Sequence, residues 1–278
     1  MTQTRARRLY ATLGFAAAIV FAAAPLSAQY KAPSLNEPAT GEQYLIEGSV
    51  DLWFPTADIF LASESLGIPG NLIDFKTDLG LTDQHFPMVQ AQLRLARRHK
   101  FRFQYIPISF SQTAILRQDI IFNGQRYTLG LPVSSTLDWK AYRFGYELDF
   151  ITSDRGFGGV IVEAKYTDVA ATLTAPIKSL NEFDHARAPI PAIGGVARFY
   201  VVPNISITGE VTGFRLPGSL VKNASGHYVD VDVYGTLNFT NNIGVRGGYR
   251  SLDLGYGFKS DSGSFTLKGI YFGMVARY

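Results

Sequence analysis

Residues 142–150 read Tyr-Arg-Phe-Gly-Tyr-Glu-Leu-Asp-Phe, so that large apolar side chains alternate with Arg143, Glu147 and Asp149. Successive side chains of a β-strand point to opposite faces, and this stretch therefore predicts a strand with one apolar and one charged face. Such strands are typical of barrels in the outer membrane, where the outward face meets lipid and the inward face is polar. The stretch favours a membrane barrel.

The same alternation recurs on both sides of this stretch, from Tyr44 to Tyr278. In the first such stretch, Tyr44, Ile46 and the apolar residues that follow at every second position share one face, which we assign to lipid. Ten stretches of this kind predict an all-β fold, a transmembrane antiparallel up-and-down β-barrel of about ten strands. Eight or twelve strands stay open as alternatives.

The connections between the stretches differ in length from one end of the predicted barrel to the other. Four of them are short, near 97–100, 152–156, 203–204 and 241–242. The five between them are predicted to be long: 55–84, 113–133, 174–187, 217–225 and 257–263. Only an even number of strands places both chain ends on the side of the short turns.

Two of the long connections have patterns of their own. Residues 120–129 predict a small hairpin around Asn123-Gly124, because Asn-Gly favours tight hairpin turns. Residues 71–81 predict either a further outer strand or a segment folded into the mouth of the barrel, and the pattern does not choose between them.

The first 28 residues predict a secretory signal peptide. Arg5, Arg7 and Arg8 precede the apolar run 14–24, which ends at Pro25-Leu26-Ser27-Ala28. This run is shorter than the roughly 20 residues that a membrane-spanning helix needs. We therefore expect three segments: a signal peptide over 1–28, a periplasmic leader over 29–42 and an outer-membrane barrel over 43–278.

The charge balance and the lack of cysteine exclude several classes of function. Removing the signal peptide leaves 23 basic and 23 acidic residues, from the 26 and 23 of the whole chain. A neutral chain does not favour nucleic acid as a partner. Without cysteine there is no disulfide, thiolate metal site or cysteine nucleophile. The four histidines are scattered without ligand spacing, so we predict no metal and no cofactor.

The inward faces carry most of the chemistry that the sequence predicts. Alternation places fifteen charged residues in the lumen: Glu47, Asp51, Arg94, Arg102, Arg143, Glu147, Asp149, Glu163, Lys165, Arg198, Glu210, Asp230, Asp232, Arg246 and Arg250. Isolated charges away from water are costly, so these groups must be paired or hydrated. Eight acids and seven bases of mixed sign predict a network across the lumen, and hence a plugged or very narrow barrel.

Three functional hypotheses follow. The first is a non-enzymatic structural or surface-interaction protein that acts through the loops around 59–81 and 117–131. Its expected partners are outer-membrane lipids, the barrel-assembly machinery and an extracellular ligand that the sequence does not name. The second is a narrow channel for small solutes, with selectivity set by these residues: Arg94, Arg143, Glu147, Arg246 and Arg250.

The third hypothesis is a surface hydrolase. Asp83-Gln84-His85 and Asp230-Val231-Asp232 resemble the active-site composition of the omptin proteases, in which such groups activate a water molecule. The order along the chain is the reverse of that in the omptins. A further alternative concerns the fold: a secreted soluble barrel of the lipocalin type would bury the apolar face instead of exposing it to lipid.

Several segments resemble recurring stretches of a group of bacterial outer-membrane β-barrel proteins with no assigned substrate. They are Ile73–Leu81, Arg98–Lys100, Asp119–Gly124, Val133–Ser135, Gly248–Arg250 and Gly269–Gly273. The chain end, with Phe272, Met274 and Tyr278 on one face, resembles the C-terminal signal that outer-membrane assembly machinery reads. Similarity to the small OmpA-type barrel domains is more distant. These resemblances imply the fold and an outer-membrane location, and no catalytic residues.

Overall fold

The computed structural model describes residues 39–62, 70–122, 124–175, 180–216, 218, 224–258 and 261–278. The chain divides into Met1–Ala32 and Pro33–Tyr278, and all described residues belong to the second unit. The predicted signal peptide and leader residues 29–38 lie outside the described residues. In the described part of the chain, no helix is long and apolar enough to cross a membrane.

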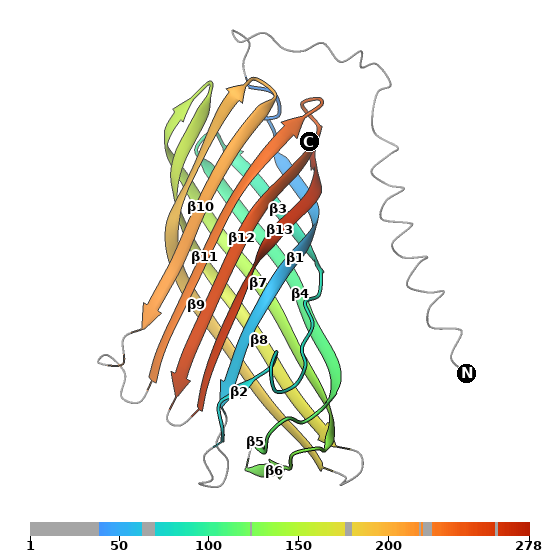
Figure 1. Cartoon of the computed structure of the whole chain (residues 1–278). Coiled ribbons are helices and arrows are strands. Elements are labelled where there is room, and N and C mark those ends of the chain that lie inside the picture. Colours follow the sequence, from blue (N-terminus) through green and yellow to red (C-terminus); the bar gives the residue numbers. More distant parts are fainter. Residues whose placement is uncertain are drawn as a thin grey trace, which may run out of the picture. The chain divides into compact units, whose positions relative to one another are not determined.

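The described chain forms thirteen strands, ten of which make a closed antiparallel barrel (Figure 1). The ten barrel strands are β1 (Ile46–Ala62), β3 (Phe86–Ala96), β4 (His99–Ile115), β7 (Pro132–Ser153), β8 (Gly156–Ala175), β9 (Leu180–Val202), β10 (Ile205–Leu216), β11 (Ala224–Asn238), β12 (Ile243–Phe258) and β13 (Asp261–Arg277). Each pairs with the next of these ten strands along the chain, and β13 closes the barrel by pairing with β1 from Glu47↔Arg277 to Ala62↔Ser262. The predicted fold class and the count of ten strands are confirmed.

The two ends of the barrel differ as the turn lengths predicted. The short-turn end carries the turns at 97–98, 154–155, 203–204 and 239–242, and the last strand ends there at Arg277. The long-loop end carries β2 (Ile73–Asp74) and the hairpin of β5 (Ile120–Phe122) and β6 (Gln125–Tyr127). The pairing of β5 with β6 confirms the predicted hairpin, with Gly124 at φ 79°, whereas Asn123 lies outside the described residues.

Two of the five connections predicted as long are short. Strand β8 continues to Ala175 and β9 begins at Leu180, and only 259–260 separate β12 from β13, whereas 217–223 between β10 and β11 is close to the predicted 217–225. The prediction was wrong because it ended the strands at the thickness of a membrane. Barrel strands need roughly 9–11 residues to cross one, whereas β1 has 17 residues and β9 has 23.

In the part of the strands nearer the long-loop end, the distribution of polar and apolar side chains between the two faces is reversed. On β4 the inward side chains run from the short-turn end as Lys100, Arg102, Gln104, Ile106, Ile108 and Phe110. The outward ones run as Phe101, Phe103, Tyr105, Pro107, Ser109 and Ser111. The short-turn half is therefore polar inside and apolar outside, and the long-loop half is apolar inside and polar outside.

Two segments fill the apolar half, and we call them the cap segments: residues 70–85 and 116–131. Their large side chains pack against inward wall residues such as Trp53, Phe110 and Trp139 in one buried cluster. The cap side chains in that cluster are Ile73, Phe75, Leu79, Leu81, Leu116, Ile120, Phe122, Tyr127 and Leu131. Of the two alternatives for residues 71–81, the structure therefore shows the segment folded into the mouth.

Backbone hydrogen bonds join the cap segments to the wall and to each other. The Phe75 amide donates to the Ile59 carbonyl at 3.0 Å, and the Asn71 amide donates to the Ile121 carbonyl at 3.2 Å. The Tyr127 hydroxyl donates to the Leu173 carbonyl at 3.1 Å. These bonds give polar groups of the cap segments partners within the protein, which polar groups away from water require.

Candidate functional site

All fifteen predicted lumen charges lie on inward faces in the short-turn half of the barrel. Thirteen of them are buried, and Arg94 and Arg102 are partly buried. The strands place them there because inward side chains of one strand are an even number of residues apart. The structure joins these charges through several groups of contacts.

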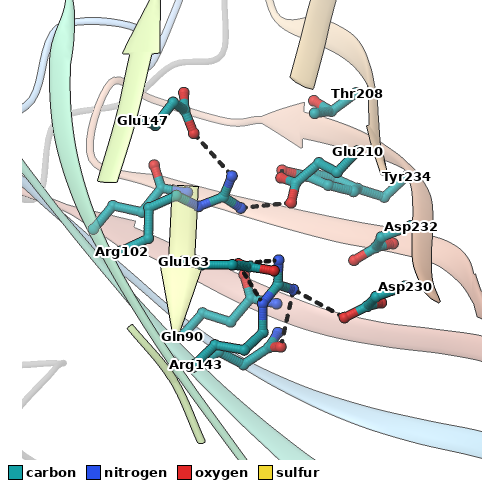
Figure 2. A network of polar contacts seen from close by, with 12 residues as sticks. Gln90, Arg102, Arg143, Glu147, Glu163, Thr208, Glu210, Asp230, Asp232 and Tyr234 are labelled. Carbon is teal, nitrogen blue, oxygen red and sulfur yellow. Dashed lines mark hydrogen bonds and ion pairs between the residues drawn. The ribbon is translucent and has the colours of Figure 1, made fainter. Parts of the chain in front are cut away.

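Arg102 on β4 connects two strands across the lumen. Its Nη1 lies 2.8 Å from Glu147 of β7, and its Nη2 lies 2.5 Å from Glu210 of β10 (Figure 2). Lys100 on the same strand lies 2.7 Å from Glu147 and 2.8 Å from Asp149. The Lys100 ammonium also lies 3.5 Å from the ring centroid of Phe157, a cation–π contact.

A second group centres on Asp230 of β11. Arg250 donates to it through Nε at 3.0 Å and Nη2 at 2.7 Å. Lys165 lies 3.0 Å from the same carboxylate. Arg143 lies 3.3 Å from it (Figure 2). Arg143 and Lys165 also pair with Glu163, at 2.8 Å and 3.0 Å. Three bases thus surround Asp230, and two of them share a second acid.

The neighbouring Asp232 and the ion pairs of β1 complete the network. Asp232 accepts a hydrogen bond from the Tyr271 hydroxyl at 2.9 Å. Asp51 forms a bidentate pair with Arg246, whose remaining Nη1 donates to Gln90 at 3.2 Å. A Cβ at Gly273 would lie 2.0 Å from Asp51 Oδ1, so only glycine leaves room for that pair.

The structure adds three charged groups to the network that the sequence analysis did not assign. Lys100 and Arg277 are inward and buried, and Arg277 pairs with Glu47. Lys100 lies two residues before Arg102 and therefore shares its inward face, and Arg277 lies three residues after the outward Met274 and therefore faces inward. The alternation of the sequence thus contained the signal for both. Glu42 precedes the first strand, and no periodicity in the sequence assigns it to the lumen.

Glu42 closes the network at the mouth of the short-turn end. Its carboxylate lies 2.9 Å from Arg94, 3.4 Å from Arg198 and 2.7 Å from the Tyr200 hydroxyl. Burial alone would raise its pKa, but Arg198, Tyr200 and Arg94 outweigh burial and hold the pKa of Glu42 below its usual value. The ionised carboxylate is therefore part of the folded arrangement.

The backbone around Glu42 is bound to the barrel as well. The Thr40 amide donates to the Pro203 carbonyl at 2.7 Å, and Asn238 Nδ2 donates to the Thr40 carbonyl at 2.7 Å. Gly41 has φ 80°, and a Cβ there would lie 2.6 Å from the Arg277 guanidinium. Residues 39–42, the last four of the predicted leader, are thus docked on the barrel mouth.

This docking also changes the first strand. Tyr44, assigned by alternation to the lipid face, instead points inward and donates to Gln92 Oε1 at 3.0 Å. The strand begins only at Ile46, and the chain before it bends over the mouth, so that the alternation does not extend back to Tyr44. That assignment was wrong.

The four residues of the hydrolase hypothesis do not come together. His85 is exposed and stacks on Phe54, an outward residue, with ring centroids 5.8 Å apart. Asp83 is bound to the Ala57 amide at 3.1 Å and to Lys76 at 3.5 Å, whereas Asp230 and Asp232 are buried in the lumen. The described residues also contain no group of three or more His, Cys, Asp or Glu that could hold a metal ion.

The residues of the predicted assembly signal lie on the outside of the last strand. Phe272, Met274 and Tyr278 are 59%, 58% and 85% exposed. They continue the apolar outward face of β13, on which Ile270 is also exposed.

Fold and lumen together define a closed ten-stranded antiparallel barrel of the kind found in bacterial outer-membrane proteins. No protein-family model and no curated protein matches this sequence. Among solved structures, the fold is similar to that of the outer-membrane protease OmpT from Escherichia coli, with a TM-score of 0.55 and 9% identity over 88% of this chain and 100% of that one. The likeness is one of fold alone.

Two further solved structures match with lower scores. The toluene transporter TodX from Pseudomonas putida has a TM-score of 0.36 and 9% identity, covering 87% of this chain and 92% of that one. The translocator domain of the autotransporter NalP from Neisseria meningitidis has a TM-score of 0.32 and 9% identity, covering 88% and 91%. Both TM-scores are lower than that for OmpT.

Proposed function

We propose that this chain is an integral outer-membrane protein with a closed lumen, and that its role is structural or in surface interaction rather than catalytic. Its long-loop end would face the outside of the cell and its short-turn end the periplasm, as is usual for such barrels. The expected partners are outer-membrane lipids, the barrel-assembly machinery and an extracellular ligand.

The outward face of the short-turn half supports insertion in a membrane. Exposed apolar side chains follow one another around it, among them Val50, Phe144, Phe150, Ile193, Phe199, Ile207, Val211, Val233, Ile270 and Phe272. On β7 this face runs from Tyr142 to Phe150, a length that matches the roughly 9–11 residues of a membrane strand. A lipocalin-like soluble barrel would expose this face to water at a large free-energy cost.

The observation that supports the closed-lumen proposal is that inward side chains contact one another in both halves of the barrel. In the short-turn half the charged side chains pair with each other, and the hollow beside Arg102, Arg143 and Glu163 has a volume of only about 10 Å³. That volume is about the minimum for one water molecule. In the long-loop half, the cap segments and the wall form one apolar core.

The cap segments and the rim around them support the surface role. Leu72, Ile115 and Leu129 are 61%, 67% and 63% exposed at this end, although apolar side chains are buried beside them. A rigid platform that presents such residues suits contact with another molecule. The non-enzymatic part of the proposal is supported by the separation of His85 from the lumen carboxylates.

Single-channel conductance in a planar bilayer tests the closed lumen. The mature protein is refolded, and only material whose unheated gel band shifts on boiling is used, so that the barrel is known to be folded. We expect no discrete current steps at a protein density at which a general porin gives them. Discrete steps would overturn the closed lumen and support the narrow channel instead, with Arg143 and Glu147 as the first selectivity residues to change.

A further inference from the structure

A groove of about 640 Å³ crosses the outward face of β3, β4, β7 and β8 in the short-turn half. Two rows of outward side chains form its walls. One row consists of Ala91, Phe103, Phe144 and Ala164, and the other of Leu93, Phe101, Tyr146 and Val162. Aromatic pairs stand at the middle of each wall, with ring centroids 5.1 Å apart for Phe103–Phe144 and 5.5 Å apart for Phe101–Tyr146.

The floor between these rows offers no polar group to a ligand. It is the paired backbone of Gln92, Arg102, Gly145 and Glu163, whose side chains, where present, belong to the inward face. Their backbone groups belong to paired strands of the sheet, and Arg102 and Glu163 are engaged in the lumen ion pairs. The groove is therefore suited to hydrocarbon.

A basic turn lies next to this groove. Arg97, Arg98 and His99 are exposed on the turn that joins β3 to β4, the two strands that carry Leu93 and Phe101. The Arg98 carbonyl accepts a hydrogen bond from the Asp149 amide at 2.9 Å, and His99 Nδ1 is hydrogen-bonded to the Tyr146 hydroxyl. The turn is thus fixed against β7, which supplies the middle of the groove.

Positive charge at this end of the barrel is unevenly placed around the rim. Of the four short turns, those at 203–204 and 239–242 contain no basic residue, and the one at 154–155 contains Arg155 next to the acidic Asp154. The 97–98 turn contains two arginines and no acid. Arg97 also borders the mouth cavity beside Glu42.

We infer that the groove and the basic turn together bind one anionic glycerophospholipid of the periplasmic leaflet, with an acyl chain in the groove and the phosphate at Arg97, Arg98 and His99. This inference rests on the proposed membrane insertion. Leu93↔Phe101 lies about 10 Å from the turn, at roughly 3.3 Å per residue, which suits a phosphate at the headgroup level above hydrocarbon. Arginine favours phosphate because its planar guanidinium donates two parallel hydrogen bonds.

The test uses lipids of matched acyl chains. The refolded protein is placed in nanodiscs of equal phosphatidylglycerol and phosphatidylethanolamine, and the lipids retained after release are counted by native mass spectrometry. We expect the wild type to retain phosphatidylglycerol at least three-fold over phosphatidylethanolamine. The variant R97Q/R98Q should retain both equally, and A164L, which fills the β8 end of the groove, should lower the retained lipid at least three-fold.

Matched controls separate the site from general effects. R155Q removes one positive charge from the neighbouring turn, and A197L adds the same side chain to an outward alanine of β9, away from the groove; both should behave as the wild type. Equal retention of the two lipids by the wild type, or equal losses in the controls, would overturn the site. A protein that does not float with vesicles in a density gradient would instead overturn the proposed membrane insertion.

Discussion

Arg250 of β12 and Asp230 of β11 lie diagonally across one strand pair and form a bidentate ion pair in the lumen. Arg250 is 0% exposed and Asp230 is 3% exposed. Removing one partner of a buried pair leaves the other charge uncompensated, which costs roughly 3–5 kcal/mol. We expect Asp230→Asn to lower the free energy of unfolding by about that amount, measured by urea unfolding of the protein refolded in vesicles.

The control for this variant is Asp253→Asn on the neighbouring strand. Asp253 faces outward, its side chain is 40% exposed, and it pairs with His227 at 3.1 Å. Exposed pairs contribute about 1 kcal/mol or less, so D253N should unfold close to the wild type. Equal unfolding midpoints for D230N and D253N would show that the lumen network does not stabilise the barrel.

A second prediction concerns the pH dependence of the docked residues 39–42. The pKa of Glu42 is lowered in the folded protein, so its contribution to docking is present above the usual pKa of glutamate and is lost as the pH falls through the lower, folded value. We expect amide exchange at Gly41 and Leu45, relative to intrinsic rates, to rise steeply only below about pH 4.5. In Glu42→Gln the relative exchange should be faster and independent of pH, and an unchanged pH profile would contradict the role of this carboxylate.

A third prediction uses the two tryptophans of the chain. Trp53 and Trp139 are 0% and 1% exposed and both point into the lumen. We expect blue-shifted emission and weak quenching by brominated lipids, because the barrel wall separates both rings from the acyl chains. W53F/F54W moves one indole to the outward face and should be quenched strongly. Equal quenching of the two proteins would show that the faces of β1 are assigned wrongly.

A fourth prediction addresses the cap segments. Phe75 is 1% exposed in the apolar core, and truncating a buried phenylalanine costs roughly 3–5 kcal/mol. In Phe75→Ala we expect residues 70–85 to become sensitive to protease added outside intact vesicles, while the barrel keeps its heat-dependent gel shift. Leu72→Ala, at an exposed site in the same segment, should remain resistant. Resistance of F75A would mean that the segment is held by its backbone contacts alone.

The faces of the short-turn half could be predicted because period-two alternation acts residue by residue. Arg143, Glu147 and Asp149 required only their own positions in the strand to be assigned inward. The prediction for Tyr44 was wrong because the strand begins two residues later, at Ile46, and the chain before it is docked on the barrel mouth. Glu42 lies outside any strand, and its place beside Arg94, Arg198 and Tyr200 joins residues that are far apart in the sequence.

The amino-acid sequence by itself determined the antiparallel strands, their number and the polar face in the short-turn half, since these depend on alternation and turn residues within each hairpin. Only the tertiary structure decided which face of the strands is shielded from water in the long-loop half of the barrel. Ile106, Ile108 and Phe110 alternate with polar residues whether they face lipid or a core, and only the cap segments that pack against them make the inward side apolar. The pairing of each lumen charge likewise follows from barrel closure, which brings strands distant in sequence within hydrogen-bonding distance.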